Sequence, residues 1–185
     1  MLSQFVSPYP HHRLLGDLEF NFPEGTHAVG RLDEHSEGLL ILTNDKSITR
    51  NLLHPKKQHT RQYLVQVQKI MSDETIEQLK SGITILIKQR GEYLTKPCLV
   101  RRIEEPNNIP SNELLGKDYF PSTWLEFTLT EGKNRQIRKM CKAVKHKCKR
   151  LLRTKIENLE LGELKAGEVL ELEKEIFFSR LNLSE

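Results

Sequence analysis

Apolar and polar residues alternate along several short stretches of this chain, and between these stretches apolar residues recur at helical spacing. Alternation, or a short apolar run, is typical of a strand, and a spacing of three to four residues is typical of an amphipathic helix. Helices are predicted over residues 46–53 and 72–80. Strands are predicted over residues 39–43, 63–67, 83–87, 98–103 and 124–130.

Local signals support the ends of these helices. The pair Asn44 and Asp45 suits the start of the first helix, and the His-Pro pair at 54–55 stops it. Ser72 is the expected N-cap of the second helix, because its side chain can accept a hydrogen bond from the first turn. Gly82 is expected to end that helix.

A third helix is predicted after the strand at 124–130. Its inner face has apolar residues at helical spacing, and its other faces have basic residues; the apolar residues are Ile137, Met140, Cys141 and Val144. Residues 104–122, rich in Pro and Asn, are predicted to form a long loop. Strands and short helices without a regular strand-helix repeat indicate an α+β fold with a mainly antiparallel sheet.

Charge changes the picture more through its distribution than through its total, which is +4 over 185 residues. Between residues 133 and 155 there are eleven lysines and arginines and no acidic residue. Such a segment is typical of a phosphate-binding surface, which gives strong, salt-sensitive affinity for nucleic acid. The alternative is a solvated basic surface without a partner.

Several classes of protein are not indicated. No apolar run is long enough to span a bilayer, and the first residues lack the pattern of a secretory signal, so a cytoplasmic location is expected. The three cysteines, Cys98, Cys141 and Cys148, are widely spaced. We therefore expect reduced thiols, and neither a disulfide framework nor a metal site.

The strongest candidate for chemistry is Asp33. The stretch 28–45 places this carboxylate between two turns marked by Gly30 and Gly38 and just before an apolar strand. A side chain on such a turn is rigidly placed and accessible, as functional residues often are. Because Gly and Asp also form ordinary turns, spacing alone leaves a plain surface turn open.

The longer string closely resembles the catalytic motif of the RsuA-type pseudouridine synthases, which modify RNA. The matching segments, in the same order, are residues 30–40 (GRLDEHSEGLL), 61–65 (RQYLV) and 131–140 (EGKNRQIRKM). The loop before residues 121–125 is most similar to the RluE-like branch, which acts on large-subunit (23S) ribosomal RNA.

The resemblance implies the pseudouridine synthase fold, with a bent central sheet, flanking helices and a cleft between two lobes. A single catalytic domain is expected over residues 1–185, with lobes at roughly 1–60 and 61–185 and no separate N-terminal RNA-binding module. It also implies action on ribosomal RNA. A monomer is expected, because no exposed apolar helix stripe requires a partner, and no cofactor is expected.

Residue roles follow from the same resemblance. Asp33 matches the catalytic aspartate, Tyr63 the active-site tyrosine that stacks on the base, and Arg138 the basic residue that pairs with the aspartate. Arg31 is a candidate to fill the space left by an extruded uridine, with a simple phosphate or turn contact as the alternative. The charge of the basic segment, independently of the resemblance, gives the expected RNA-binding residues Lys133, Arg135, Lys139, Lys142, Arg150 and Arg153.

Two other functions remain open on the sequence. One is a catalytically inactive factor of ribosome assembly that binds ribosomal RNA on the same fold. The other is a hydrolase that uses Asp33 together with Glu37. A hydrolase leaves the basic segment unexplained, and an inactive binder has no need to keep Asp33, Tyr63 and Arg138 together.

Overall fold

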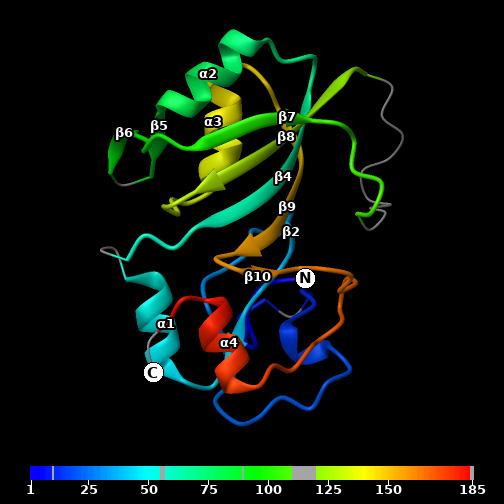
Figure 1. Ribbon diagram of the computed structural model, residues 1–185. Coiled ribbons are helices and arrows are strands. Elements are labelled where there is room, and N and C mark those ends of the chain that lie inside the picture. Colours follow the sequence, from blue (N-terminus) through cyan, green and yellow to red (C-terminus); the bar gives the residue numbers. More distant parts are fainter. Residues whose placement is uncertain (10, 55–56, 89, 110–119, 184–185) are drawn as a thin grey trace.

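A long central sheet crosses the middle of the molecule (Figure 1). The computed structural model describes residues 1–9, 11–54, 57–88, 90–109 and 120–183. Within them the sheet has six strands, in the order β10-β9-β4-β8-β7 with β2 added beside β9. Only β2 and β9 pair in parallel; the other neighbours are antiparallel. The strands are β2 (Glu37–Gly38), β4 (Arg61–Gln68), β7 (Leu99–Ile103), β8 (Ser122–Leu129), β9 (Cys148–Ile156) and β10 (Leu159–Glu160).

The upper part of the sheet in Figure 1 packs against two helices and a hairpin, which form the first core. These elements are α2 (Asp73–Ser81), α3 (Gln136–Ala143), β5 (Thr84–Ile87) and β6 (Gly91–Leu94). Val65 of β4 and Phe127 of β8 meet Leu79 of α2 and Met140 of α3, and all four side chains are fully buried. Fully burying such a side chain contributes roughly 1.5–3 kcal/mol. This core makes β4 and β9 a rigid base for a functional site.

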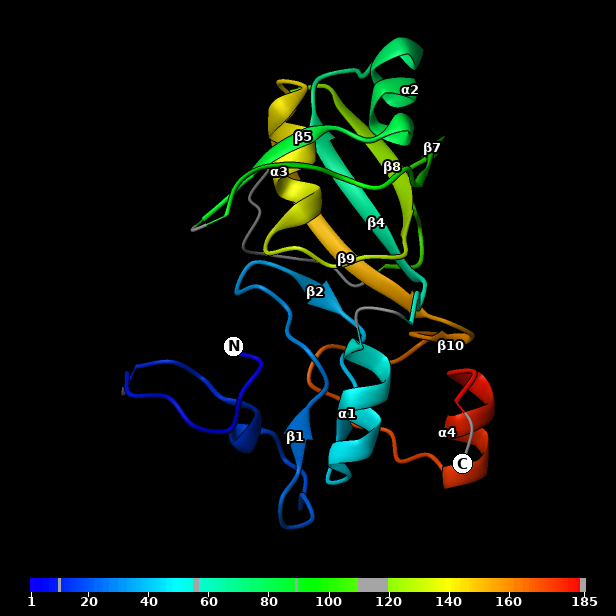
Figure 2. The ribbon, with the colours of Figure 1, turned by 90° about the vertical axis from the view of Figure 1, so that its left-hand side faces the viewer.

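The lower part contains a second core, formed by segments from both ends of the chain (Figure 2). The elements in this part of the molecule are a 3-10 helix (Leu15–Asp17), β1 (His27–Ala28), β3 (Leu42–Thr43), α1 (Lys46–Leu53) and α4 (Lys174–Arg180). Ile48 and Leu52 of α1 cluster with Phe178 and Leu181 from the end of the chain. The division expected from the sequence gave the whole of 61–185 to one lobe. The last helix lies with the N-terminal residues instead, because its apolar face completes their core.

Most of the predicted elements are present, and the α+β class with a mainly antiparallel sheet is confirmed. Helix α1 has the predicted bounds, and Asp45 accepts a hydrogen bond from the Ser47 amide at 2.7 Å. The Ser72 hydroxyl caps α2 as expected. The predicted third helix buries its apolar face, with Val144 following as its C-cap.

The prediction of one strand over residues 39–43 is wrong. The chain forms β2 beside β9, leaves the central sheet at Leu39, and then forms β3 against β1. Leu39 and Ile41 turn into the second core. Strand β6 lies between the predicted strands at 83–87 and 98–103, where no element was predicted, and residues 110–119 of the predicted long loop lie outside the described residues.

Candidate active site

The loop between β1 and β2 holds Asp33 through a set of local hydrogen bonds. Gly30, with φ of 76°, begins the loop, and the Ser36 amide closes a turn by donating to the Asp33 carbonyl at 2.8 Å. The Ser3 hydroxyl accepts from the Leu32 amide at 3.0 Å. The Asp33 backbone is therefore fixed from both sides, while its side chain is only partly buried.

Gly38 fastens the end of this loop to the central sheet. It pairs with Arg153 of β9 and has a φ of 99°, a region that side-chain-bearing residues rarely adopt. A Cβ atom at this position would lie 2.2 Å from the Arg153 carbonyl oxygen. Only glycine allows this approach, so the second glycine of the motif is what places the loop against the sheet.

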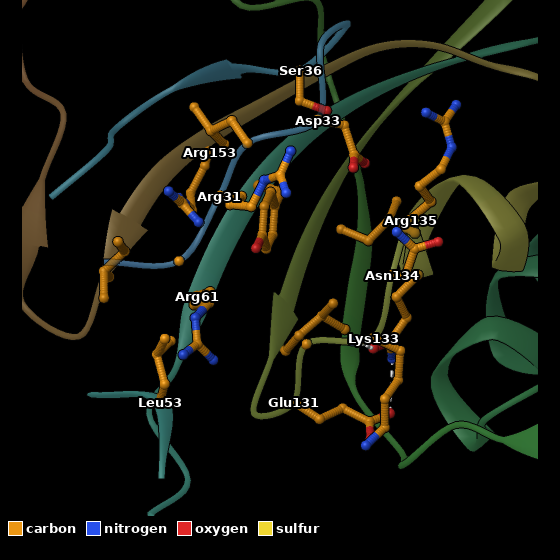
Figure 3. Close-up of a pocket in the computed structure, with 18 of the residues that line it drawn as sticks. Arg31, Asp33, Ser36, Leu53, Arg61, Glu131, Lys133, Asn134, Arg135 and Arg153 are labelled. Atoms are coloured by element: carbon orange, nitrogen blue, oxygen red, sulfur yellow. Dashed lines mark hydrogen bonds and ion pairs between the residues drawn. The ribbon is translucent and has the colours of Figure 1, made fainter. Parts of the chain in front are cut away.

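Asp33 and Tyr63 line one pocket, of about 750 Å³, between the two cores. Tyr63 lies on β4, on the face that continues into the first core. Figure 3 shows the labelled pocket residues in two groups. Arg31, Arg61 and Arg153 lie on one side, and Glu131, Lys133, Asn134 and Arg135 lie on the other. This volume is within the usual range for sites that enclose a small ligand.

Arg153 is the most deeply buried charged side chain of the pocket, at 5% exposed. Its Nε donates to the Leu39 carbonyl at 2.7 Å. Burial and the nearby Arg61 guanidinium lower the pKa of Arg153, and the Tyr63 hydroxyl opposes this lowering. The sequence predicted Arg153 as one of several surface contacts to RNA, but it lies inside the pocket beside Tyr63.

The opposite wall depends on Glu131, for which the sequence predicted no role. Its carboxylate accepts hydrogen bonds from the Tyr93 hydroxyl at 2.6 Å, the Lys96 amide at 2.9 Å and the Gln136 side chain at 2.8 Å. The hydrogen bond to Glu131, with burial, raises the pKa of Tyr93 to about 12. Lys133 lies 4.8 Å above the Tyr93 ring. An acidic residue two positions before the start of the basic segment was the signal that could have pointed to this network.

Arg138 does not join Asp33 in the pocket. Its guanidinium donates to the His35 carbonyl and, at 3.3 Å, to the Ser36 hydroxyl. Among the described residues it forms no ion pair with Asp33, contrary to the pairing that the resemblance implied. The reason is that the turn after Asp33 passes over α3 and presents its backbone, not its carboxylate, to this arginine.

A second, basic groove adjoins the pocket and continues past Arg138. Its lining includes Arg135, Lys139 and Lys142, as well as the residues that follow α3. Arg150 is not available there, because it is 6% exposed and donates two hydrogen bonds to the Glu37 carboxylate, at 3.0 and 2.8 Å. The prediction that Arg150 contacts RNA therefore does not fit its position.

No metal or membrane feature is found in the part of the chain that the structure describes. It contains no group of three or more His, Cys, Asp or Glu side chains that could hold a metal ion. None of its helices has the length and apolar composition needed to cross a membrane.

Comparison with known proteins identifies the family. A model of the RNA pseudouridylate synthase family matches residues 12–143. This chain belongs to that family. It is 34% identical to the ribosomal large subunit pseudouridine synthase E of Xanthomonas axonopodis pv. citri over 89% of this chain and 84% of the relative. The enzyme of the same name from Vibrio parahaemolyticus is 33% identical over 80% of this chain, which spans 60% of that protein.

Solved structures agree with this RNA pseudouridylate synthase assignment. A crystal structure of a pseudouridylate synthase superposes with a TM-score of 0.70 at 25% identity, over 88% of this chain and 63% of the other. A subunit of a Cbf5-Nop10-Gar1 complex shares the fold at 15% identity and a TM-score of 0.51. The resemblance to RsuA-type and RluE-like synthases is thereby confirmed, since several relatives carry the synthase E name.

Proposed function

We propose that this chain isomerises a specific uridine to pseudouridine in large-subunit (23S) ribosomal RNA, with Asp33 as the catalytic carboxylate. The observation that carries the proposal is that Asp33 and Tyr63 line one pocket between two walls of basic side chains. The names of the relatives supply the substrate class, because several are ribosomal large subunit pseudouridine synthases.

The reaction breaks the bond between N1 of uracil and C1′ of ribose, rotates the uracil and joins C5 to C1′. The carboxylate of Asp33 either attacks C1′ or removes a sugar proton to form a glycal-like intermediate. In both routes it stabilises positive charge that develops at the sugar. A partly buried carboxylate on a fixed loop meets this need, since it is held in place and accessible to a nucleotide.

Tyr63 has two roles in this proposal. Its ring stacks on the uracil, and its hydroxyl assists removal of the proton from C5 after the new bond has formed. Arg138 positions the loop, since its hydrogen bonds to His35 and Ser36 fix the turn that carries Asp33. Arg138 therefore acts through the geometry of the loop and not through a direct ion pair.

RNA binding is assigned to exposed or half-exposed cations around the pocket. Lys133 and Arg135 lie on its wall, and Lys139 and Lys142 follow in the basic groove. These side chains would neutralise backbone phosphates on either side of the target nucleotide. Arg31 borders the pocket and is exposed, so it can enter the stack that the uridine leaves.

The test is carbodiimide mapping of pseudouridine in ribosomal RNA after incubation with the parent chain or with Asp33→Asn. A new stop that depends on Asp33 identifies the reaction and the nucleotide together. Asp45→Asn is the matched control, because Asp45 caps α1 outside the pocket and asparagine caps helices equally well. Conversion is expected with the parent and with Asp45→Asn only.

Binding must be measured alongside conversion. Asp33→Asn is expected to retain salt-sensitive binding of ribosomal RNA, because the basic groove is unchanged. If the parent binds the RNA and converts no uridine in either subunit's RNA, the chain is an inactive binding factor and the proposal fails. Conversion by Asp33→Asn near the parent rate would remove Asp33 from the mechanism.

A further inference from the structure

Arg153 carries a positive charge that the described part of the chain leaves without a carboxylate partner. Its Nε donates to a neutral backbone carbonyl, the Tyr63 hydroxyl is its other polar neighbour, and its Nη2 is enclosed without any hydrogen-bond partner. Other basic residues nearby are compensated: Arg150 is paired with Glu37, and Lys133 lies 4.0 Å from Glu131. Arg61 also donates only to backbone carbonyls, at 3.2 Å, but it is half-buried, whereas Arg153 is buried.

This arrangement is costly for the folded protein. A buried charge loses its hydration, and the loss is offset only by an opposite charge or by full hydrogen bonding. The burial of Arg153 lowers its pKa, and the like charge of Arg61 lowers it further against the opposing effect of Tyr63. A buried cation without a carboxylate partner can bind a negative charge that enters or develops in the pocket.

The strand register shows which part of an RNA substrate reaches Arg153. Arg153 of β9 is the direct partner of Tyr63 on β4, so both side chains leave the same face of the sheet. A base stacked on the Tyr63 ring would lie beside the Arg153 guanidinium. Backbone phosphates would remain near the more exposed Lys133 and Arg135 at the other wall. Arg153 is therefore placed to contact the base.

We propose that Arg153 is a catalytic residue that stabilises the negative charge on uracil when the bond between N1 and C1′ breaks. This inference rests on the proposed function. The bonding electrons leave with N1, so the detached uracil is an anion whose charge is shared with its carbonyl oxygens. Arg153 donates a hydrogen bond to one of these oxygens and stays protonated. The charge is removed when C5 bonds to C1′, the C5 proton departs and N1 gains a proton.

The first test compares single-turnover conversion by the parent, Arg153→Lys and Arg153→Met on a transcript that contains the mapped uridine. Removing one donor to a developing anion lowers the rate by about 10²–10³-fold. Arg153→Met is expected to show this loss and Arg153→Lys a smaller one, because lysine keeps the charge without the planar fork. Arg153→Lys also serves as the folding control, checked by circular dichroism.

RNA affinity separates contact with the base from contact with a phosphate. Filter binding at several salt concentrations is expected to give the parent affinity and the parent salt slope for Arg153→Met. Lys139→Met should bind more weakly, with a salt slope reduced by about one. If Arg153→Met shows that second pattern, Arg153 binds a phosphate and the inference is overturned.

A transcript with 5-fluorouridine at the target distinguishes catalysis from a structural role. Fluorine withdraws electrons and stabilises the uracil anion without help from the protein. The fold-loss caused by Arg153→Met is therefore expected to be smaller on this RNA than on uridine RNA, measured as loss of the target nucleoside from digests. Equal losses on both RNAs would show that Arg153 only maintains the structure.

The two proposals fail in different ways. A parent chain that converts no uridine overturns the proposed function, and this inference with it. A parent that converts uridine while Arg153→Met keeps the parent rate overturns the inference alone.

Discussion

Replacing Gly38 by alanine is expected to destabilise the protein far more than the same change at Gly30. Both glycines belong to the loop that carries Asp33, and both have positive φ, 99° and 76°. An alanine at either position adopts a left-handed conformation, which costs about 1–2 kcal/mol. The two positions differ in the atoms that lie nearest to the new Cβ atom.

The Cβ atom at Gly38 would lie 2.2 Å from the carbonyl oxygen and 2.8 Å from the amide nitrogen of Arg153, whereas real Cβ contacts stay beyond 3.0 Å. These are backbone atoms of the central strand, so β2 must move away. The hydrogen bond from the Leu39 amide to the Arg153 carbonyl, at 2.8 Å, is then lost with its neighbours. At about 1 kcal/mol for each hydrogen bond, the total cost is about 3–5 kcal/mol.

At Gly30 the nearest atom to the new Cβ is Leu53 Cδ2 at 3.6 Å, an ordinary contact with a flexible side chain. Gly30→Ala is therefore expected to cost only about 1–2 kcal/mol. Urea unfolding followed by circular dichroism measures both values. Each kcal/mol shifts the melting temperature by about 2–4 °C in a chain of this size. Equal destabilisation by the two substitutions would refute the steric argument.

The remaining predictions concern the pKa of one tyrosine, the reactivity of two cysteines and the stability of one turn. Glu131→Gln is expected to return the Tyr93 pKa from about 12 toward its usual value, seen by tyrosinate absorbance in a pH titration. Because the raised pKa belongs to the folded state, its contribution to stability is present below pH 10 and is lost as the pH rises to about 12. Burial raises the thiol pKa of Cys98 and Cys148 to about 11, so both should react slowly with a thiol reagent at pH 8 and quickly after unfolding. Glu157→Gly relieves a positive φ of 49° but removes hydrogen bonds of the carboxylate, including one at 2.8 Å, and is expected to destabilise by about 1 kcal/mol in urea unfolding.

The sequence predicted the elements that depend on local signals. Helix α1 is bounded by its own cap, and α2 begins at Ser72, because capping uses residues within one turn. Asp33 and Tyr63 were predicted from short contiguous motifs, which can be recognised in one sequence. The structure places both residues in the lining of one pocket. No local pattern could assign α4, since its apolar face is completed by residues from the start of the chain.

Strand β9 was not predicted from the sequence, for a different reason. Its register against β4 shifts twice, so its buried residues do not alternate strictly. Two of them, Arg150 and Arg153, are arginines, which normally indicate an exposed surface. Arg150 is buried because Glu37, more than a hundred residues away in the chain, compensates its charge. Such a partner is visible only in the folded structure.

The basic segment therefore serves two purposes that composition alone cannot separate. Its first part lies on and around α3, where Lys139 and Lys142 line an open groove suited to phosphates. Its second part is β9. This strand pairs with β2, which follows Asp33 in the chain, and with β4, which carries Tyr63. One strand thus fixes the distance between the carboxylate and the aromatic ring and places Arg153 beside both of the elements that carry them. If the buried arginine served only to bind RNA, any exposed position in the segment would suit it better, because phosphate binding does not require the loss of hydration that burial imposes.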